Sequence, residues 1–168
     1  GKLNKAKKGE LRFPLPVGYC YDEQGRIVPD ADAEVRGAVA MVFHLFRETG
    51  SAYAVVHRFT ERGLRFPKRA YGGAWDGKII WGRLSHSRVL GVLKNPSYAG
   101  IYVFGRYQYR REINLDGEVR KRMQAVAMPA WRVSLQQHHE GYITVEEFVK
   151  NRERLQKNRT NGEETLLS

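Results

Sequence analysis

The chain has 168 residues, of which 42% are hydrophobic, so it can bury one good-sized core and is not a disordered tail. Lysine and arginine outnumber aspartate and glutamate by 29 to 18, and the resulting charge of +11 indicates a polyanionic partner, most often nucleic acid. An anionic membrane is the weaker option, because no apolar run approaches the roughly 18 residues of a spanning helix and no signal peptide is recognisable. Cys20 is the only cysteine, which excludes a disulfide framework and a cysteine-based zinc site and fits a reducing, cytoplasmic setting.

Residues 1–12 are strongly basic and contain almost nothing apolar. Such a segment cannot bury itself, so it is predicted to be a mobile basic arm, although a linker made soluble by its lysines would look the same. Because the chain does not begin with methionine, we expect a fragment whose N-terminal partner domain is missing. The candidate DNA contacts in the arm are Lys2, Lys5, Lys7, Lys8 and Arg12.

The next part of the chain is predicted to form a hairpin and two helices. Residues 16–29 have β-rich stretches on both sides of a polar turn that contains a glycine. A first helix, capped by Asp30 or Asp32, then runs to about Glu48 with its apolar residues on one face. A second capped helix follows over 51–63.

Residues 64–84 are rich in glycine, arginine and aromatic residues. Trp75 and Trp81 flank an Asp-Gly pair, which indicates a short hairpin or an ordered excursion packed by its tryptophans. Three cations just before this turn are candidate DNA contacts: Arg65, Lys68 and Arg69.

A short helix is predicted after Ser85, which is a strong N-cap, and Leu84 with Val89 fits the hydrophobic staple. Asn95 before Pro96 stops the helix. The first turn offers donors that can reach base edges or phosphates, and Arg88 could make a two-pronged contact to guanine. An ordinary surface helix with a satisfied cap is the alternative. The candidate DNA contacts here are Arg83, Ser85, His86, Ser87 and Arg88.

The segment after residue 100 is predicted to be a strand followed by a basic hairpin that turns at Asp116-Gly117. Cations interleave with tyrosines along its arms, which is typical of a wing beside a recognition helix, although a solvated hairpin remains possible. The candidate DNA contacts are Arg106, Tyr107, Arg110 and Arg111.

The C-terminal region is predicted to contain one helix. Thr144 and Glu147 form a capping box, so a helix begins there and runs to about Asn158, and the polar tail at 159–168 is interpreted as a linker. His138 and His139 suggest a metal or nuclease site, but no third and fourth ligand follow at a useful spacing. A loop pair beside the helix cap is the preferred interpretation.

No catalytic motif is found: there is no glycine-rich phosphate loop, no nucleophile elbow and no convincing carboxylate dyad. We therefore expect that this chain alone is not an enzyme and uses no metal or other cofactor.

An ordered set of residues resembles the recombinase domain of large serine recombinases, the integrases of the resolvase–invertase superfamily. The set consists of Pro16, Val17, Gly18, Tyr19, Gly25, Val28, Phe46, Ser51, Gly63, Trp75, the stretch 89–93, Asn95, Pro96, Tyr98 and Gly100. The resemblance implies a DNA-engaged module between a catalytic domain, which holds the nucleophilic serine, and a zinc-ribbon domain. It also implies that the arm at 1–12 is the connector that crosses the minor groove, and that 159–168 leads towards the zinc ribbon.

These observations predict an α+β fold for residues 13–158, made of a helical trio with winged-helix character, short β-hairpins and a C-terminal capped helix. The predicted function is sequence-specific binding of double-stranded DNA at an attachment site, as the non-catalytic domain of a site-specific integrase. A winged-helix transcription regulator is the first alternative, and a metal-dependent nuclease is the second.

Overall fold

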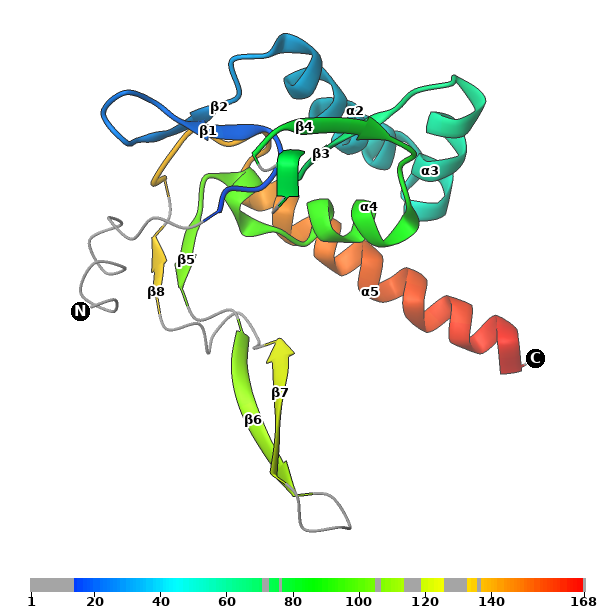
Figure 1. Cartoon of the computed structure of the whole chain (residues 1–168). Coiled ribbons are helices and arrows are strands. Elements are labelled where there is room, and N and C mark those ends of the chain that lie inside the picture. Colours follow the sequence, from blue (N-terminus) through cyan, green and yellow to red (C-terminus); the bar gives the residue numbers. More distant parts are fainter. Residues whose placement is uncertain are drawn as a thin grey trace.

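The computed structural model describes residues 14–70, 73–75, 77–104, 107–113, 119–125, 133–135 and 137–167. They form a mixed α+β fold (Figure 1). The helices are α2 (Ala33–Thr49), α3 (Ala52–Glu61), α4 (His86–Leu93) and α5 (Val145–Leu167), with 3-10 turns η1 (Gly73–Trp75) and η2 (Pro96–Ala99). The strands are β1 (Tyr19–Tyr21), β2 (Ile27–Pro29), β3 (Phe66–Arg69), β4 (Ile79–Gly82), β5 (Tyr102–Phe104), β6 (Tyr107–Ile113), β7 (Val119–Ala125) and β8 (Val133–Leu135).

Among the described residues the strands form four two-stranded antiparallel sheets: β1 with β2, β3 with β4, β5 with β8 and β6 with β7. Helices α2, α3 and α4 lie together with the β3–β4 hairpin, and the first half of α5 packs beneath them (Figure 1). The β6–β7 hairpin projects away from this body, and the C-terminal part of α5 extends beyond it in another direction (Figure 1).

The predicted helix caps are confirmed. Asp32 accepts from the backbone N–H of Glu34 at the start of α2, and Gly50 ends that helix in the left-handed conformation with φ of 69°. Ser51 and Ser85 cap α3 and α4 in the same way. Each cap satisfies an amide that the helix itself leaves unpaired, which is why the sequence locates these boundaries well.

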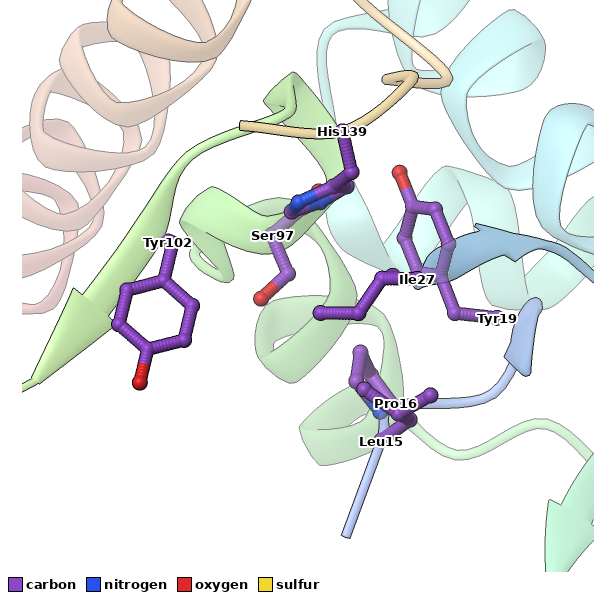
Figure 2. Close-up of a pocket in the computed structure, with 7 residues that line it drawn as sticks. All are labelled: Leu15, Pro16, Tyr19, Ile27, Ser97, Tyr102 and His139. Atoms are coloured by element: carbon purple, nitrogen blue, oxygen red, sulfur yellow. The ribbon is translucent and has the colours of Figure 1, made fainter. Parts of the chain in front are cut away.

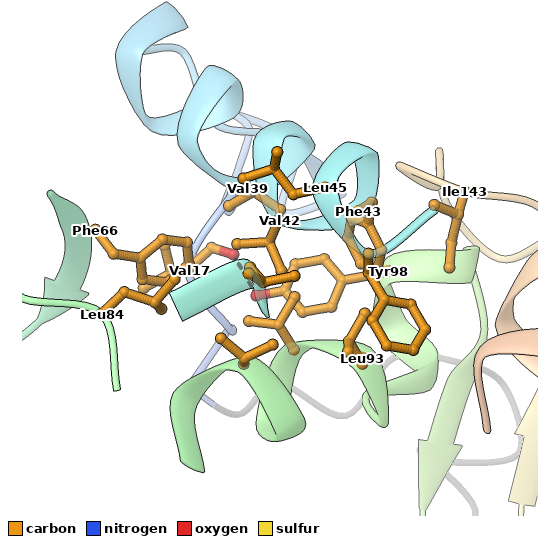
Figure 3. Close-up of a cluster of buried hydrophobic side chains, with 14 of the residues drawn as sticks. Val17, Val39, Val42, Phe43, Leu45, Phe66, Leu84, Leu93, Tyr98 and Ile143 are labelled. Carbon is orange, nitrogen blue, oxygen red and sulfur yellow. Dashed lines mark hydrogen bonds between the residues drawn. The ribbon is translucent and has the colours of Figure 1, made fainter. Parts of the chain in front are cut away.

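One hydrophobic core joins the helices (Figure 3). The predicted inner faces of the first three helices are buried in it, and Phe148 and Leu155 add the contribution of α5. The fully buried side chains of the trio include Val39, Val42, Leu45, Phe46, Val55, Val89 and Leu93.

Three tyrosine hydroxyls fasten the chain around β1 to the core. Tyr98 donates to the carbonyl of Val17 over 2.6 Å, Tyr142 donates to Gly18 over 2.5 Å, and Tyr19 donates to Glu140 over 2.8 Å. Desolvation by burial raises the pKa of all three phenols, that of Tyr142 to about 12, so they stay protonated donors. We call this group the tyrosine clamp.

The structure differs from the prediction at the C-terminal helix. Helix α5 runs to Leu167 rather than to Asn158, so the polar stretch interpreted as a linker is helical as far as that residue. Asn and Gly lower helix propensity by about 1 kcal/mol or less, whereas proline, which is absent there, would end the helix. The Thr160 hydroxyl also donates to the carbonyl of Gln156 within the helix.

The hairpin of the 64–84 region is wider than the predicted tryptophan turn. Its strands are β3 and β4, paired from Phe66 with Gly82 to Arg69 with Ile79, so the two cations Lys68 and Arg69 lie on a strand. Gly77 closes the excursion with φ of 78° and donates its N–H to Ala70.

The basic hairpin after residue 100 is confirmed as β6–β7. It follows the C-terminal end of α4 through η2 and β5, so it does not lie beside the donor-rich first turn of α4 (Figure 1). Helix α4 and the hairpin therefore present two separate surfaces.

Candidate nucleic-acid interface

The first turn of α4 is organised by hydroxyl groups. Ser85 accepts from the N–H of Arg88, and its Oγ lies 3.3 Å from that of Ser87. Both serines are exposed. The helix therefore begins at the surface with its cap formed, as the sequence predicts for an end that meets an anion.

Arg88 folds back onto the protein. Its guanidinium donates to the carbonyl of Pro67 over 3.0 Å and lies 5.5 Å from the ring centre of Phe66. These contacts fix α4 against β3. The two-pronged guanine contact predicted for Arg88 would require this hydrogen bond to be given up.

His86 stacks on Tyr53, with ring centres 4.0 Å apart and ring planes 14° apart. Tyr53 is 72% exposed and stands at the start of α3, so the pair joins two helices at the surface beside the first turn of α4. The sequence analysis missed Tyr53, because nothing in the local pattern shows which residue of a distant helix faces His86.

A surface groove runs between the end of α3 and the start of α4. Arg65 and Arg83 line it, and both are exposed. Phe66 pairs with Gly82 at the end of the β3–β4 hairpin, and Arg65 and Arg83 are the next residues outward from that pair. The lining residues are Phe59, Thr60, Gly63, Leu64, Arg65, Arg83 and Leu84.

Two more exposed cations belong to the same part of the chain. Arg62 is the C-cap residue of α3, and Lys68 lies on β3. Neither of them lines the groove, so the cations of the groove itself are Arg65 and Arg83. Cations that line a groove make a favourable environment for phosphate.

Arg69 is partly buried and its guanidinium bonds to the protein. Its guanidinium donates to the carbonyl of Tyr19 over 3.1 Å, and its Nε is buried without a hydrogen-bond partner among the described residues. It therefore links β3 to β1.

The remaining predicted site residues belong to the arm and to the basic hairpin. Lys2, Lys5, Lys7, Lys8, Arg12 and Arg106 lie outside the described residues, while Tyr107, Arg110 and Arg111 occupy positions on β6.

The histidine pair lies in the loop before α5, as predicted, and both rings are engaged. His139 Nε2 is 2.7 Å from the carbonyl of Ser97, and the Nδ1 atoms of His138 and His139 are 3.1 Å apart. His139 also lines a small cavity of about 10 Å³ with Tyr19 and Ser97, which is at the lower limit for one water molecule (Figure 2). Desolvation by burial lowers the pKa of His139.

Among the described residues no group of three or more His, Cys, Asp or Glu side chains is placed to hold a metal ion. In the same part of the chain, no helix is both long and apolar enough to span a membrane.

A family model described as Recombinase matches residues 33–158, which is most of the chain. The chain belongs to the Recombinase family. It is thus a recombinase domain of the large serine recombinases, the family that the sequence resembles. The matched residues begin at α2 and end within α5, so they include both surfaces described above.

Two known proteins are similar to this recombinase domain. The uncharacterized protein y4bA/y4pH of Sinorhizobium fredii (strain NBRC 101917 / NGR234) is 40% identical over 160 residues, which cover 95% of this chain and 22% of that protein. A solved structure described as a crystal structure of a LSR-DNA complex matches with a TM-score of 0.53 at 14% identity, over 93% of this chain and 36% of that one. The structural likeness shows a shared fold, and the chain spans about a fifth of the length of the curated relative.

Proposed function

We propose that this recombinase domain binds double-stranded DNA at an attachment site, as the non-catalytic DNA-binding part of a site-specific serine recombinase. Family membership supports the proposal, and the solved structure of the same fold is named as a DNA complex. The charge of +11 supports a polyanionic partner independently.

The observation that carries the proposal is the groove between α3 and α4. Arg65 and Arg83 both line it, one on each side of the end of the β3–β4 hairpin. Two like charges in one groove repel one another, so an anion bound there removes a repulsion as well as adding two attractions. A DNA phosphate supplies that anion.

The recombination reaction itself is proposed for a longer protein that contains this domain. We infer that a covalently linked serine-recombinase domain supplies the nucleophile and that a zinc-ribbon domain binds further DNA. Residues 13–158 would then act as the DNA-binding unit without a cofactor of their own, in the cytoplasm. The basic arm at 1–12 would add phosphate contacts that do not depend on sequence.

The test is the salt dependence of DNA binding by the 168-residue chain, measured by fluorescence anisotropy over a range of KCl concentrations. Each phosphate contact contributes about 0.9 to the slope of log K against log salt, so a slope of several units is expected. The double variant Arg65→Ala, Arg83→Ala should lower the slope by about 1–2 and weaken all DNA sequences together.

The matched control is Lys150→Ala, Lys157→Ala, which removes the same charge from exposed positions on α5. It should change the slope much less than the groove variant. A salt-independent affinity of the unmodified chain would contradict DNA binding itself. Equal effects of the two double variants would contradict the groove as the contact surface.

A further inference from the structure

The β6–β7 hairpin is a two-stranded ribbon with a defined register. Tyr107 pairs with Ala125 at one end and Ile113 pairs with Val119 at the other. Because successive residues of a strand alternate between its two faces, and opposite residues share a face, the register sorts the fourteen positions into two sets.

The two faces of the ribbon differ in chemistry. The first, which we call the glutamine–arginine face, holds the pairs Gln108–Gln124, Arg110–Arg122 and Glu112–Arg120. The second, the tyrosine face, holds Tyr107–Ala125, Tyr109–Met123, Arg111–Lys121 and Ile113–Val119. Every position of the glutamine–arginine face is thus a long polar residue, whereas the tyrosine face is mostly apolar.

The residue types of the glutamine–arginine face are those that read base edges in the major groove. Glutamine can pair with adenine, arginine with the O6 and N7 atoms of guanine, and glutamate with the amino group of cytosine. A face that contacts only solvent does not require these residue types, since lysine, serine or threonine would be equally soluble there.

The register also places like charges opposite one another. Arg110 pairs with Arg122, and Arg111 pairs with Lys121 on the other face. Directly opposite like charges destabilise an antiparallel pair in water. A strongly anionic surface around the ribbon removes this penalty, which favours DNA as the occupant.

The dimensions of the ribbon suit the same partner. Strands of this length extend about 23 Å, the span of roughly seven base pairs, and the major groove is wide enough for a two-stranded ribbon. The hairpin projects from the body, so it can enter a groove without the helices following it (Figure 1).

We propose that β6–β7 binds in the major groove and that the register positions of the glutamine–arginine face supply sequence discrimination. The cationic positions of the opposite register set, Arg111 and Lys121, supply binding to phosphate that does not depend on sequence. This inference rests on the proposed DNA binding, and it assigns base reading to the ribbon rather than to the first turn of α4, where Arg88 is already bonded to Pro67.

Two neighbouring residues provide the matched test. Arg110 and Arg111 have the same charge and adjacent positions, yet they occupy opposite faces of the ribbon. The DNA site is first selected from random sequences by the unmodified chain. Binding of Arg110→Ala and Arg111→Ala is then measured against that site and against every single-base-pair variant of it.

Arg110→Ala should reduce discrimination at one base-pair position by about 5- to 150-fold and leave the other positions unchanged. Arg111→Ala should weaken all sequences by the same factor and lower the salt slope by about 0.9. Uniform losses for both variants, or a positional loss for Arg111→Ala only, would overturn the assignment of the two faces.

A second measurement separates contact from folding of the hairpin. The double variant Arg110→Thr, Arg122→Thr replaces a repulsive pair with one that favours a strand, so amide exchange in 107–125 should slow in the free protein while discrimination falls. A variant that loses both order and discrimination would indicate a structural role and overturn the proposal.

If the unmodified chain binds no DNA, the proposed function fails. If Arg65→Ala, Arg83→Ala weakens binding and no ribbon variant changes it, only the present inference fails.

Discussion

Arg88 donates from its guanidinium to the backbone carbonyl of Pro67 over 3.0 Å, and this bond joins the first turn of α4 to β3. Pro67 is buried, so the bond reaches from the surface of α4 into the interior. The position that the sequence marks as the best base reader therefore also fixes α4 against β3.

We expect Arg88→Ala to lower the free energy of unfolding by about 1.5–3 kcal/mol, the range for a hydrogen bond from a charged group. Urea denaturation measures this change, and Arg83→Ala, an exposed arginine five positions earlier, provides the control with little expected effect. Unchanged stability together with lost discrimination at one base pair would instead show that Arg88 leaves Pro67 and reads DNA.

Gly50 should not tolerate alanine. Its φ of 69° lies in the left-handed region, and an added Cβ would meet the guanidinium of Arg154. We expect Gly50→Ala to destabilise the protein by about 1 kcal/mol or more.

Gly37, an exposed residue in the second turn of α2, is the matched control for that prediction. A Cβ there would meet nothing within 4 Å, so Gly37→Ala should stabilise the protein by about 0.5–1 kcal/mol through helix propensity. Thermal unfolding of the two variants should therefore shift in opposite directions, and a shift in the same direction would contradict the account of Gly50.

Stability should fall when the pH drops below about 6.5, because burial holds the pKa of His139 below that ordinary value. In this range the unfolded chain binds a proton that the folded chain does not, so acid favours unfolding. The Ser97 carbonyl can only accept, so Nε2 of His139 donates to it, and Nδ1 then accepts from His138 when the ring is neutral. A proton added to Nδ1 disturbs that arrangement.

Urea denaturation at pH 7.5 and pH 5.5 measures the effect. His139→Gln should lose part of the pH dependence, whereas His57→Gln, at an exposed position on α3, should keep it. Equal pH dependence in the unmodified chain and in both variants would assign the effect to other groups.

Much of the fold is predictable from the sequence because its signals are local. A cap, a glycine in the left-handed region and an apolar stripe each specify one helix within a few residues, and α2, α3 and α4 begin where their caps predict. The end of α5 is harder to predict, because no strong stop signal marks it and small differences in helix propensity decide where the helix ends.

The candidate site is less predictable, because its decisive partners are backbone atoms. Arg88 and Arg69 bond the carbonyls of Pro67 and Tyr19, and a carbonyl acceptor leaves no mark on the residue type that carries it. The sequence therefore offered both arginines as DNA contacts on the same grounds as Arg65 and Arg83, which the structure leaves exposed.

The tyrosine clamp has a consequence for how the domain is made. Tyr19 and Glu140 are 121 residues apart in the chain, and Gly18 and Tyr142 are 124 apart, so the clamp cannot close until most of the chain has left the ribosome. At about 5–20 residues per second this takes roughly 6–25 s. The local pair of α2 and α3 can form long before that. A nascent chain interrupted before Glu140 could therefore form only the bond from Tyr98 to Val17, and the hairpin of β1 and β2 would lack the other two.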